Sequence, residues 1–181
     1  MTRALIVIDV QESFRQRPNW AEISDPDIAE RVGRLVDAAR AAGDQVIWVL
    51  HTEPGSDTVF DPASGHVRLI DGLKPEHDEP TIHKTAHNAF TTTNLAQRLT
   101  TAGVRELIIC GIRTEQCCET TARVGSDLGY DITFVTEATA TQPITLGGKT
   151  LGVDEIKERT EFALAARFAT IASIAEVTGL S

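Results

Sequence analysis

The sequence predicts an α/β domain in which helices cover both faces of a parallel β-sheet. Short, almost wholly apolar runs alternate with segments whose apolar residues recur at the helical period, and Gly or Pro often separates the two. The 181 residues are enough to bury one core, and no repeat, low-complexity tract or linker divides them. We therefore expect a single domain over residues 1–181.

Four short apolar runs predict buried strands, at residues 4–10, 46–50, 107–110 and 131–135. Residues 80–84 can form a further short strand, and 171–177 either closes the sheet or packs on it. The carboxyl ends of parallel strands share one edge of a sheet, and ligands bind there. Asp9, Lys84 and the turn at 111–117 each follow or end a predicted strand, so we expect them to meet at that edge.

Capping signals indicate the helices between these strands. Asp25 can cap the first helix, with Pro26 at its first position and Gly43 at its end. The other helices are expected from Thr93 or Asn94 to Gly103, over 117–129, and after a cap at Asp154. Residues 52–79 are rich in Gly and Pro and show no clear period, which is typical of a lid or a binding loop.

Charge, hydropathy and cysteine content exclude several classes of protein. The formal net charge of −9 disfavours a nucleic-acid or anionic-membrane partner, because phosphate binding requires clustered Lys and Arg. No apolar run is long enough to span a membrane, and residues 1–9 resemble a strand rather than a signal peptide. Three cysteines without a disulfide spacing fit a reducing compartment, so we expect a cytoplasmic protein.

Asp9, Lys84 and Cys117 form a combination that suits nucleophilic catalysis. Cys117 opens a predicted helix, where the positive end of the helix dipole and the Lys84 ammonium should lower the pKa of its thiol. Asp9 can accept the thiol proton and later give it to a leaving nitrogen. Free N–H groups of the turn at 111–117 can stabilise the developing oxyanion.

Each of these residues also has an ordinary structural interpretation. A cysteine in a reduced protein is commonly a small core residue, an Asp after a strand commonly forms a turn, and a Lys commonly lies on the surface. Cys110 lies inside an apolar strand, and Cys118 points about 100° around the helix from Cys117, so both fit the core better. Only the combination of the three residues favours catalysis.

Three segments resemble the motifs of the isochorismatase-like cysteine hydrolases. Residues 9–14 (DVQESF) resemble the D-x-Q-x-x-F opening, and 83–90 (HKTAHNAF) resemble the K-x-x-x-(S/N)-A-F segment. Residues 111–122 (GIRTEQCCETTA) are similar to the signature G-x-x-T-x-x-C-V-x-x-T-A. Cys118 stands where the signature has Val, which assigns it to packing and leaves Cys117 as the nucleophile. The motifs occur in the family's order and together cover most of the chain.

The resemblance implies a Rossmann-like, three-layer α/β/α sandwich around a six-stranded parallel sheet. It also implies a catalytic triad of Asp9, Lys84 and Cys117 and a thioester acyl-enzyme. A cis peptide bond between Ile112 and Arg113 would direct the backbone N–H groups of Arg113 and Cys117 at the oxyanion. Family members are usually dimers or tetramers, so the resemblance implies a homodimer or a homotetramer.

Departures from the family pattern bear on the reaction. Members that cleave the vinyl ether of isochorismate often lack the cysteine, so Cys117 favours hydrolysis of an amide, ureide or carbamoyl C–N bond. Vinyl ether hydrolysis and an inactive scaffold of the same fold are the alternatives.

The nicotinamidase branch carries a D-x-H metal pair after its second strand, where this chain has His51, Thr52 and Glu53. His51, Glu53 and His66 are candidate ligands, but a polar loop is the preferred interpretation, and we expect no metal and no cofactor.

The expected partner is a small-molecule substrate bound beside the motifs. The candidate substrate-binding residues flank them and are Phe14, Trp20, Phe60, His87, Arg113 and Gln116. Arginine has the shape for bidentate binding of a carboxylate, so Arg113 is a candidate for a substrate carboxylate. The alternative is an ion pair of Arg113 with Glu115, Glu119 or an acid of the 52–79 loop.

Overall fold

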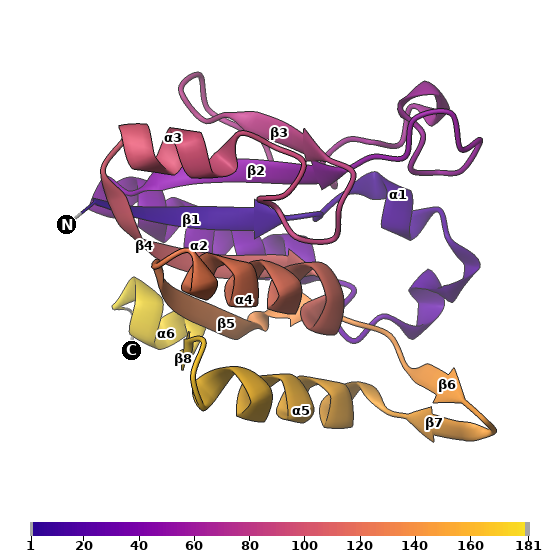
Figure 1. The fold of residues 1–181 in the computed structure, drawn as a ribbon. Helices are drawn as coiled ribbons and strands as arrows, with labels where there is room; N and C mark the ends of the chain where they lie inside the picture. Colours follow the sequence, from indigo (N-terminus) through magenta and orange to yellow (C-terminus); the bar gives the residue numbers. More distant parts are fainter. Residues whose placement is uncertain (1, 180–181) are drawn as a thin grey trace.

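Six parallel strands form one sheet, in the order β3-β2-β1-β4-β5-β8, in the computed structural model, which describes residues 2–179 (Figure 1). The strands are β1 (Thr2–Ile8), β2 (Gln45–His51), β3 (Thr81–Lys84), β4 (Val104–Ile112), β5 (Asp131–Ala140) and β8 (Thr170–Ile171). The first strand lies in the middle, because β1 pairs with β2 on one side and with β4 on the other. The predicted six-stranded parallel sheet is confirmed.

Helices cover both faces of the sheet, which gives the predicted three layers (Figure 1). One face carries α2 (Ile28–Ala42) and α6 (Ile174–Thr178). The other carries α3 (Leu95–Thr101), α4 (Glu119–Asp127) and α5 (Val153–Ala165). Short helical segments lie in the connections: α1 (Glu12–Arg15), η1 (Pro18–Glu22), η2 (Pro62–Ser64) and the π-helical turn η3 (Thr114–Cys118). None of the helices within residues 2–179 has the length and hydrophobicity to span a bilayer.

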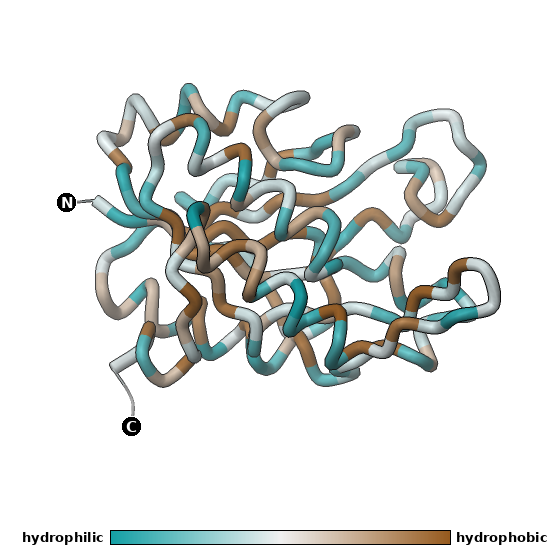
Figure 2. Tube along the Cα trace, turned by 60° about the horizontal axis from the view of Figure 1, so that its bottom comes forward, coloured by the Kyte–Doolittle hydropathy of each residue, from teal (hydrophilic) through white to brown (hydrophobic). Residues whose placement is uncertain are grey.

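Successive residues of β1 enter two separate apolar layers. Ala4, Ile6 and Ile8 pack in the layer of α3, α4 and α5. Leu5 and Val7 pack in the layer of α2, and all five residues are 0% exposed. A strand buried on both faces needs an apolar residue at every position, which explains the unbroken apolar run in the sequence. Figure 2 shows the hydrophobic segments gathered in the middle of the molecule, where the central strands lie.

The start of α2 differs from the prediction. Its N-cap is Asp27 and not Asp25, so the predicted cap is wrong. Asp25 instead accepts a hydrogen bond from the backbone N–H of Asp27 at 3.1 Å and forms an ion pair with Arg31 at 2.6 Å. These contacts make a turn before the helix rather than its first residue. Gly43 ends the helix with a φ of 74°, as predicted, because this left-handed conformation suits glycine.

Two helix starts in the second half of the chain also differ. The regular helix predicted over 117–129 covers only 119–127, because the residues before it form the π-helical turn η3. α5 follows Gly152, so Asp154 lies in the first turn of the helix and is not its cap. The carboxylate of Glu155, in the first turn, accepts the backbone N–H of the N-cap residue Gly152 at 2.8 Å.

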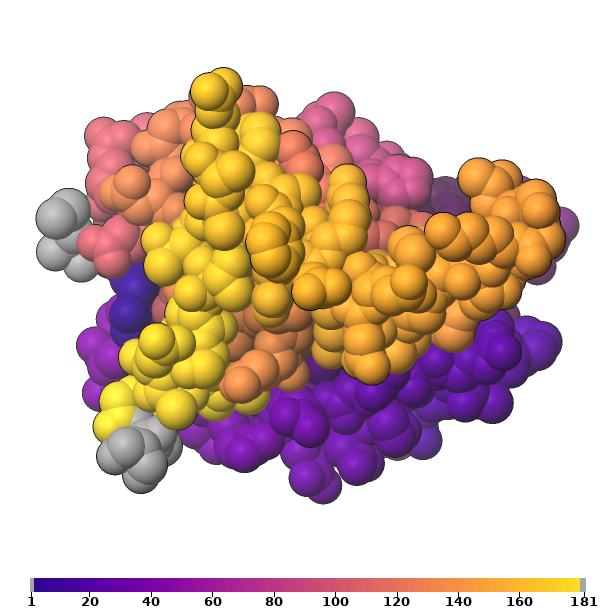
Figure 3. Space-filling model, turned by 90° about the horizontal axis from the view of Figure 1, so that it is seen from below, coloured from indigo at the N-terminus to yellow at the C-terminus, as the bar shows by residue number. Residues whose placement is uncertain are grey.

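The structure contains an antiparallel hairpin that is absent from the predicted elements, and it defines the last segment of the chain. β6 (Ile144–Leu146) and β7 (Lys149–Leu151) form the hairpin, which extends from the body of the molecule (Figure 3). Gly147 and Gly148, both with positive φ, are its signal in the sequence, since such pairs form two-residue hairpin turns. The final predicted segment divides into β8, which closes the sheet, and α6, which packs on it.

β4 approaches β1 so closely at Gly111 that there is no room for a side chain. A Cβ on Gly111 would lie 1.9 Å from the backbone oxygen of Ile8, and the φ of 132° also disfavours side chains. We expect Gly111→Ala to lower the free energy of unfolding by about 2–5 kcal/mol, measured by urea denaturation. Gly43→Ala is the matched control, because it has positive φ but nothing within 4 Å. It should cost only about 1–2 kcal/mol, and equal losses would contradict the packing argument.

Candidate active site

Asp9, Lys84 and Cys117 come together at the carboxyl edge of the sheet. Asp9 directly follows β1, Lys84 is the last residue of β3, and Cys117 lies in the turn η3 after β4. β2 lies between β1 and β3 and ends there with His51. The sequence separates these residues by many positions, and the parallel strand order brings them to one point.

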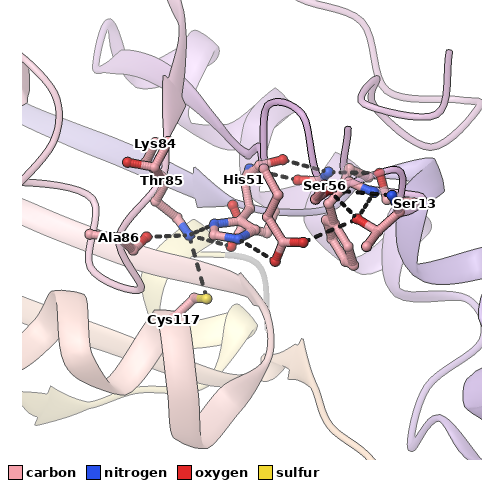
Figure 4. Close-up of polar contacts among 12 residues, drawn as sticks. Ser13, His51, Ser56, Lys84, Thr85, Ala86 and Cys117 are labelled. Atoms are coloured by element: carbon pink, nitrogen blue, oxygen red, sulfur yellow. Dashed lines mark hydrogen bonds and ion pairs between the residues drawn. The ribbon is translucent and has the colours of Figure 1, made fainter. Parts of the chain in front are cut away.

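The Lys84 ammonium is the centre of the group (Figure 4). Its Nζ lies 2.7 Å from Asp9 Oδ2 and 3.4 Å from Cys117 Sγ. It also donates to the backbone oxygen of Ala86 at 3.2 Å. Asp9 and Lys84 are 0% exposed and Cys117 is 7% exposed, so water screens these charges very little. An acid, a cation and a thiol are thus held in contact inside the protein.

Burial and charge set the protonation of the three groups. Burial raises the pKa of the Cys117 thiol to about 12, with a further rise from the Asp9 carboxylate that Lys84 only partly opposes. The expectation of a lowered thiol pKa is therefore wrong for the free protein, because burial outweighs the nearby ammonium. Burial also raises the pKa of Asp9, against the effect of Lys84. Burial alone would lower the pKa of Lys84, but Asp9 and Cys117 outweigh it and raise the pKa.

Two threonine hydroxyls fix the turn that carries Cys117. The Thr121 hydroxyl donates to the backbone oxygen of Cys117 at 2.6 Å and accepts the backbone N–H of Ala89 at 3.1 Å. It therefore joins the nucleophile turn to the loop after Lys84. The Thr114 hydroxyl donates to Thr139 at 2.7 Å, which ties the turn to β5. All of these residues except Thr139 lie in the motif segments.

The peptide bond between Ile112 and Arg113 is cis, as the resemblance implied. The backbone oxygen of Arg113 accepts N–H groups from Gln116 and Cys118, both at 3.2 Å. These two hydrogen bonds close the turn, so η3 begins directly after β4. Cys118 is 0% exposed and packs in the apolar layer of α3 and α4, in agreement with its assignment to the core.

Four aromatic and imidazole side chains form a series of ring contacts that includes His51, the neighbour of Lys84. Phe14 and Phe60 pack edge to face with ring centroids 5.1 Å apart, and Phe60 contacts the His51 ring at 5.6 Å. The His87 ring lies 6.5 Å from that of His51. The loop at 52–79 contributes Phe60 to this cluster, and one isolated bridge from Leu69 to Gln11 ties the loop to the segment after β1.

Trp20, Gln116 and Arg113 have other surroundings. Trp20 is half-buried against the apolar layer of α2, and Gln116 lies half-buried within η3. Arg113 forms an ion pair with Glu115 at 2.9 Å and donates to the backbone oxygen of Gln142 at 3.3 Å. This is the ion-pair alternative stated for Arg113, with Glu115 as the partner. Both contacts involve Nη2, so the guanidinium is partly occupied, whereas Nε is buried without a hydrogen-bond partner.

His51 has contacts that the sequence did not predict. Gln11 clamps its backbone, accepting the His51 N–H at 2.7 Å and donating to its oxygen at 3.0 Å. The His51 ring lies 3.4 Å from Lys84 Nζ and 3.3 Å from the Glu53 carboxylate. Within residues 2–179, no three His, Cys, Asp or Glu side chains are arranged to hold a metal ion. The sequence signal for the contact with Lys84 was the position of His51 at the end of β2, because β2 pairs with β3 and β3 ends with Lys84.

The raised thiol pKa gives a prediction for Asp9. At pH 7 iodoacetamide should alkylate Cys117 of the wild type slowly, because the thiol is protonated up to a pKa of about 12. Asp9→Asn removes a charge that raises this pKa and leaves Lys84 in place, so alkylation should become at least about tenfold faster. Peptide mass spectrometry measures the rate, with Cys117→Ala as the control for the other thiols. Alkylation no faster than in the wild type would contradict these electrostatics.

Known proteins resemble this chain in sequence and in fold. The isochorismatase domain model matches residues 3–176. The isochorismatase family protein YrdC of Bacillus subtilis (strain 168) is 30% identical over 138 residues, which are 76% of this chain and 73% of that protein. Nicotinamidase 3 of Arabidopsis thaliana is 32% identical over 152 residues, covering 76% of this chain and 73% of its own.

A solved structure agrees with both sequence comparisons. The crystal structure of a cysteine hydrolase from Pseudomonas syringae pv. phaseolicola 1448A superposes with a TM-score of 0.89 at 27% identity. The match covers 98% of this chain and 91% of that one. The motif segments, the strand order and these similarities all lead to the same family. This chain belongs to the isochorismatase family of hydrolases.

Proposed function

We propose that this protein hydrolyses a C–N bond of a small amide, ureide or carbamoyl compound through a thioester on Cys117. One observation carries the proposal: the Lys84 ammonium lies 2.7 Å from the Asp9 carboxylate and 3.4 Å from the Cys117 sulfur. A base, a cation and a nucleophile in mutual contact provide what acyl transfer needs. A relative named as a nicotinamidase supports an amide as the bond cleaved.

Acylation starts from a protonated thiol, since burial raises the pKa of Cys117 to about 12. Asp9 accepts this proton as the sulfur attacks the carbonyl carbon of the substrate, and Lys84 stabilises the thiolate that develops. The carbonyl oxygen becomes an oxyanion, which the backbone N–H groups of Arg113 and Cys117 would stabilise. The C–N bond then breaks, and protonated Asp9 gives its proton to the leaving nitrogen.

Deacylation repeats the same proton transfers with water. The Asp9 carboxylate accepts a proton from a water molecule, whose oxygen attacks the thioester carbon. The second tetrahedral intermediate collapses by breaking the C–S bond, and Asp9 returns the proton to the sulfur of Cys117. The acid is released, and the thiol, the carboxylate and the Lys84 ammonium are restored. Each turnover therefore consumes one water molecule and forms an amine or ammonia and an acid.

Cys117 and its neighbour Cys118 provide a matched test of this mechanism. On a panel of primary amides, ureides, carbamoyl compounds and isochorismate, Cys117→Ala should abolish C–N hydrolysis. Cys118→Ala should keep most of it, because Cys118 packs in the core and is 0% exposed. Product release is measured by chromatography, and mass spectrometry of quenched wild-type enzyme should detect an acyl group on Cys117.

The panel also tests the alternatives to this proposal. Wild-type turnover of an amide by Cys117→Ala would rule out covalent catalysis. Hydrolysis of isochorismate alone, independent of Cys117, would favour the vinyl ether reaction. Failure to turn over any member of the panel would favour an inactive scaffold over an enzyme of this specificity.

Arg113 is expected to stabilise the signature turn rather than to select substrates. Its ion pair with Glu115 at 2.9 Å already satisfies part of the guanidinium. Arg113→Met should therefore lower kcat/KM for carboxylate-bearing and neutral amides by the same factor, measured on matched substrates. A loss of about 1.5–3 kcal/mol confined to the carboxylate-bearing substrates would instead identify Arg113 as their binding residue.

A further inference from the structure

More acceptors surround the Lys84 ammonium than it has N–H groups (Figure 4). An ammonium has three N–H donors. Four acceptors lie near Nζ: Asp9 Oδ2 at 2.7 Å, the Ala86 backbone oxygen at 3.2 Å, and Cys117 Sγ and His51 Nδ1, both at 3.4 Å. The contact with Asp9 is an ion pair whose carboxylate oxygens have no hydrogen-bond partner, whereas the other three contacts have hydrogen-bond geometry. The three N–H groups of Lys84 are therefore directed at the Ala86 oxygen, the Cys117 sulfur and the His51 imidazole.

The contacts of His51 define which of its nitrogens carries the proton. Nε2 lies 3.3 Å from Glu53 Oε1, and an ionised carboxylate only accepts hydrogen bonds. Nε2 must therefore be the N–H nitrogen, which leaves Nδ1 as an acceptor that faces Lys84. Glu53 is itself oriented, because its other oxygen accepts the hydroxyl of Thr58 at 3.1 Å.

The imidazole is fixed in this orientation from two sides. The clamp from Gln11 holds the backbone of His51, with bonds of 2.7 and 3.0 Å. The ring packs against Phe60 with centroids 5.6 Å apart, and the side chain is only 15% exposed. An acceptor held this firmly restricts where the Lys84 ammonium can point.

We propose that His51 is a positioning residue that holds Lys84 in place through its unprotonated Nδ1, above all while Cys117 is acylated. The inference rests on the proposed function of this site. In the acyl-enzyme the sulfur belongs to a thioester and is a weak acceptor, so the Ala86 oxygen and His51 Nδ1 remain as the hydrogen-bond acceptors that hold Lys84. His51 then keeps the ammonium beside Asp9 while water attacks.

This role makes the activity depend on a neutral imidazole. A proton on Nδ1 would remove the acceptor and place a second positive charge 3.4 Å from Lys84 Nζ. The groups facing the ring are Glu53 from the end of β2, Lys84 from β3, Asp9 from β1 and the His87 ring at 6.5 Å. His51 can therefore hold Lys84 only while Nδ1 carries no proton.

The tautomer can be tested without any substrate. Long-range ¹H–¹⁵N spectra distinguish the two neutral forms of an imidazole, and His51→Asn identifies the signal of His51 among the five histidines. At pH 8 we expect the form protonated at Nε2. A form protonated at Nδ1 would overturn the proposal, since that nitrogen could not accept from Lys84.

Two substitutions separate positioning from packing. His51→Phe keeps a ring against Phe60 but has no acceptor, and at pH 8 it should lower kcat/KM for the best amide of the panel about 10- to 100-fold. His51→Asn can present an oxygen near the place of Nδ1 and should restore most of this loss. His83→Asn is the control, because His83 is an exposed residue one position before Lys84. Wild-type kcat/KM in His51→Phe, or no restoration in His51→Asn, would contradict the proposal.

Restoration by His51→Asn is the reading that a packing role would not give, because Asn can supply an acceptor but has no ring. A form protonated at Nδ1, or no restoration in His51→Asn, would refute the role of His51 and leave the hydrolase proposal intact. If no amide is turned over, the hydrolase proposal fails, and the tautomer alone decides the role of His51.

Discussion

The buried ion pair between Asp9 and Lys84 is the constraint on which the rest of the site depends. Removing two charges from water costs several kcal/mol for each ion, so such a pair survives only with close geometry and further hydrogen bonds. The distance of 2.7 Å and the bond from Lys84 to Ala86 supply both. The end of β1 and the end of the edge strand β3 must therefore stay aligned across β2, because these two strands position the two charges.

The same burial determines how the nucleophile works. A thiol with a pKa of about 12 is protonated in the free enzyme, so in the proposed mechanism Cys117 becomes reactive only when Asp9 accepts its proton. The approach of β4 to β1 makes this contact possible, because Gly111 has no side chain to strike Ile8 and the turn after β4 can bring Cys117 close. Thr121 then links that turn to the loop of Lys84 by hydrogen bonds. The strand packing and the proton transfer therefore depend on the same few contacts.

The loop at 52–79 and the end of β2 meet at the His51 ring. Phe60 from the loop packs against His51, and Glu53 at the start of the loop contacts the other side of the same ring. In the proposed role of His51, this region acts on the chemistry through the position of Lys84. Changes at His51 would therefore alter the position of the ammonium, whereas changes at Asp9 or Cys117 would remove a reacting group.

The sequence by itself determined the parallel sheet and the end of α2 at Gly43. It also determined that Asp9 and Lys84 lie at the ends of strands and that Cys117 lies in the turn after a strand. These follow from residue type and local spacing, because apolar runs and glycine act within a few positions. Only the tertiary structure decided the raised pKa of Cys117 and the contact of His51 with Lys84. Both depend on burial and on distances between segments far apart in the chain, which no local pattern records.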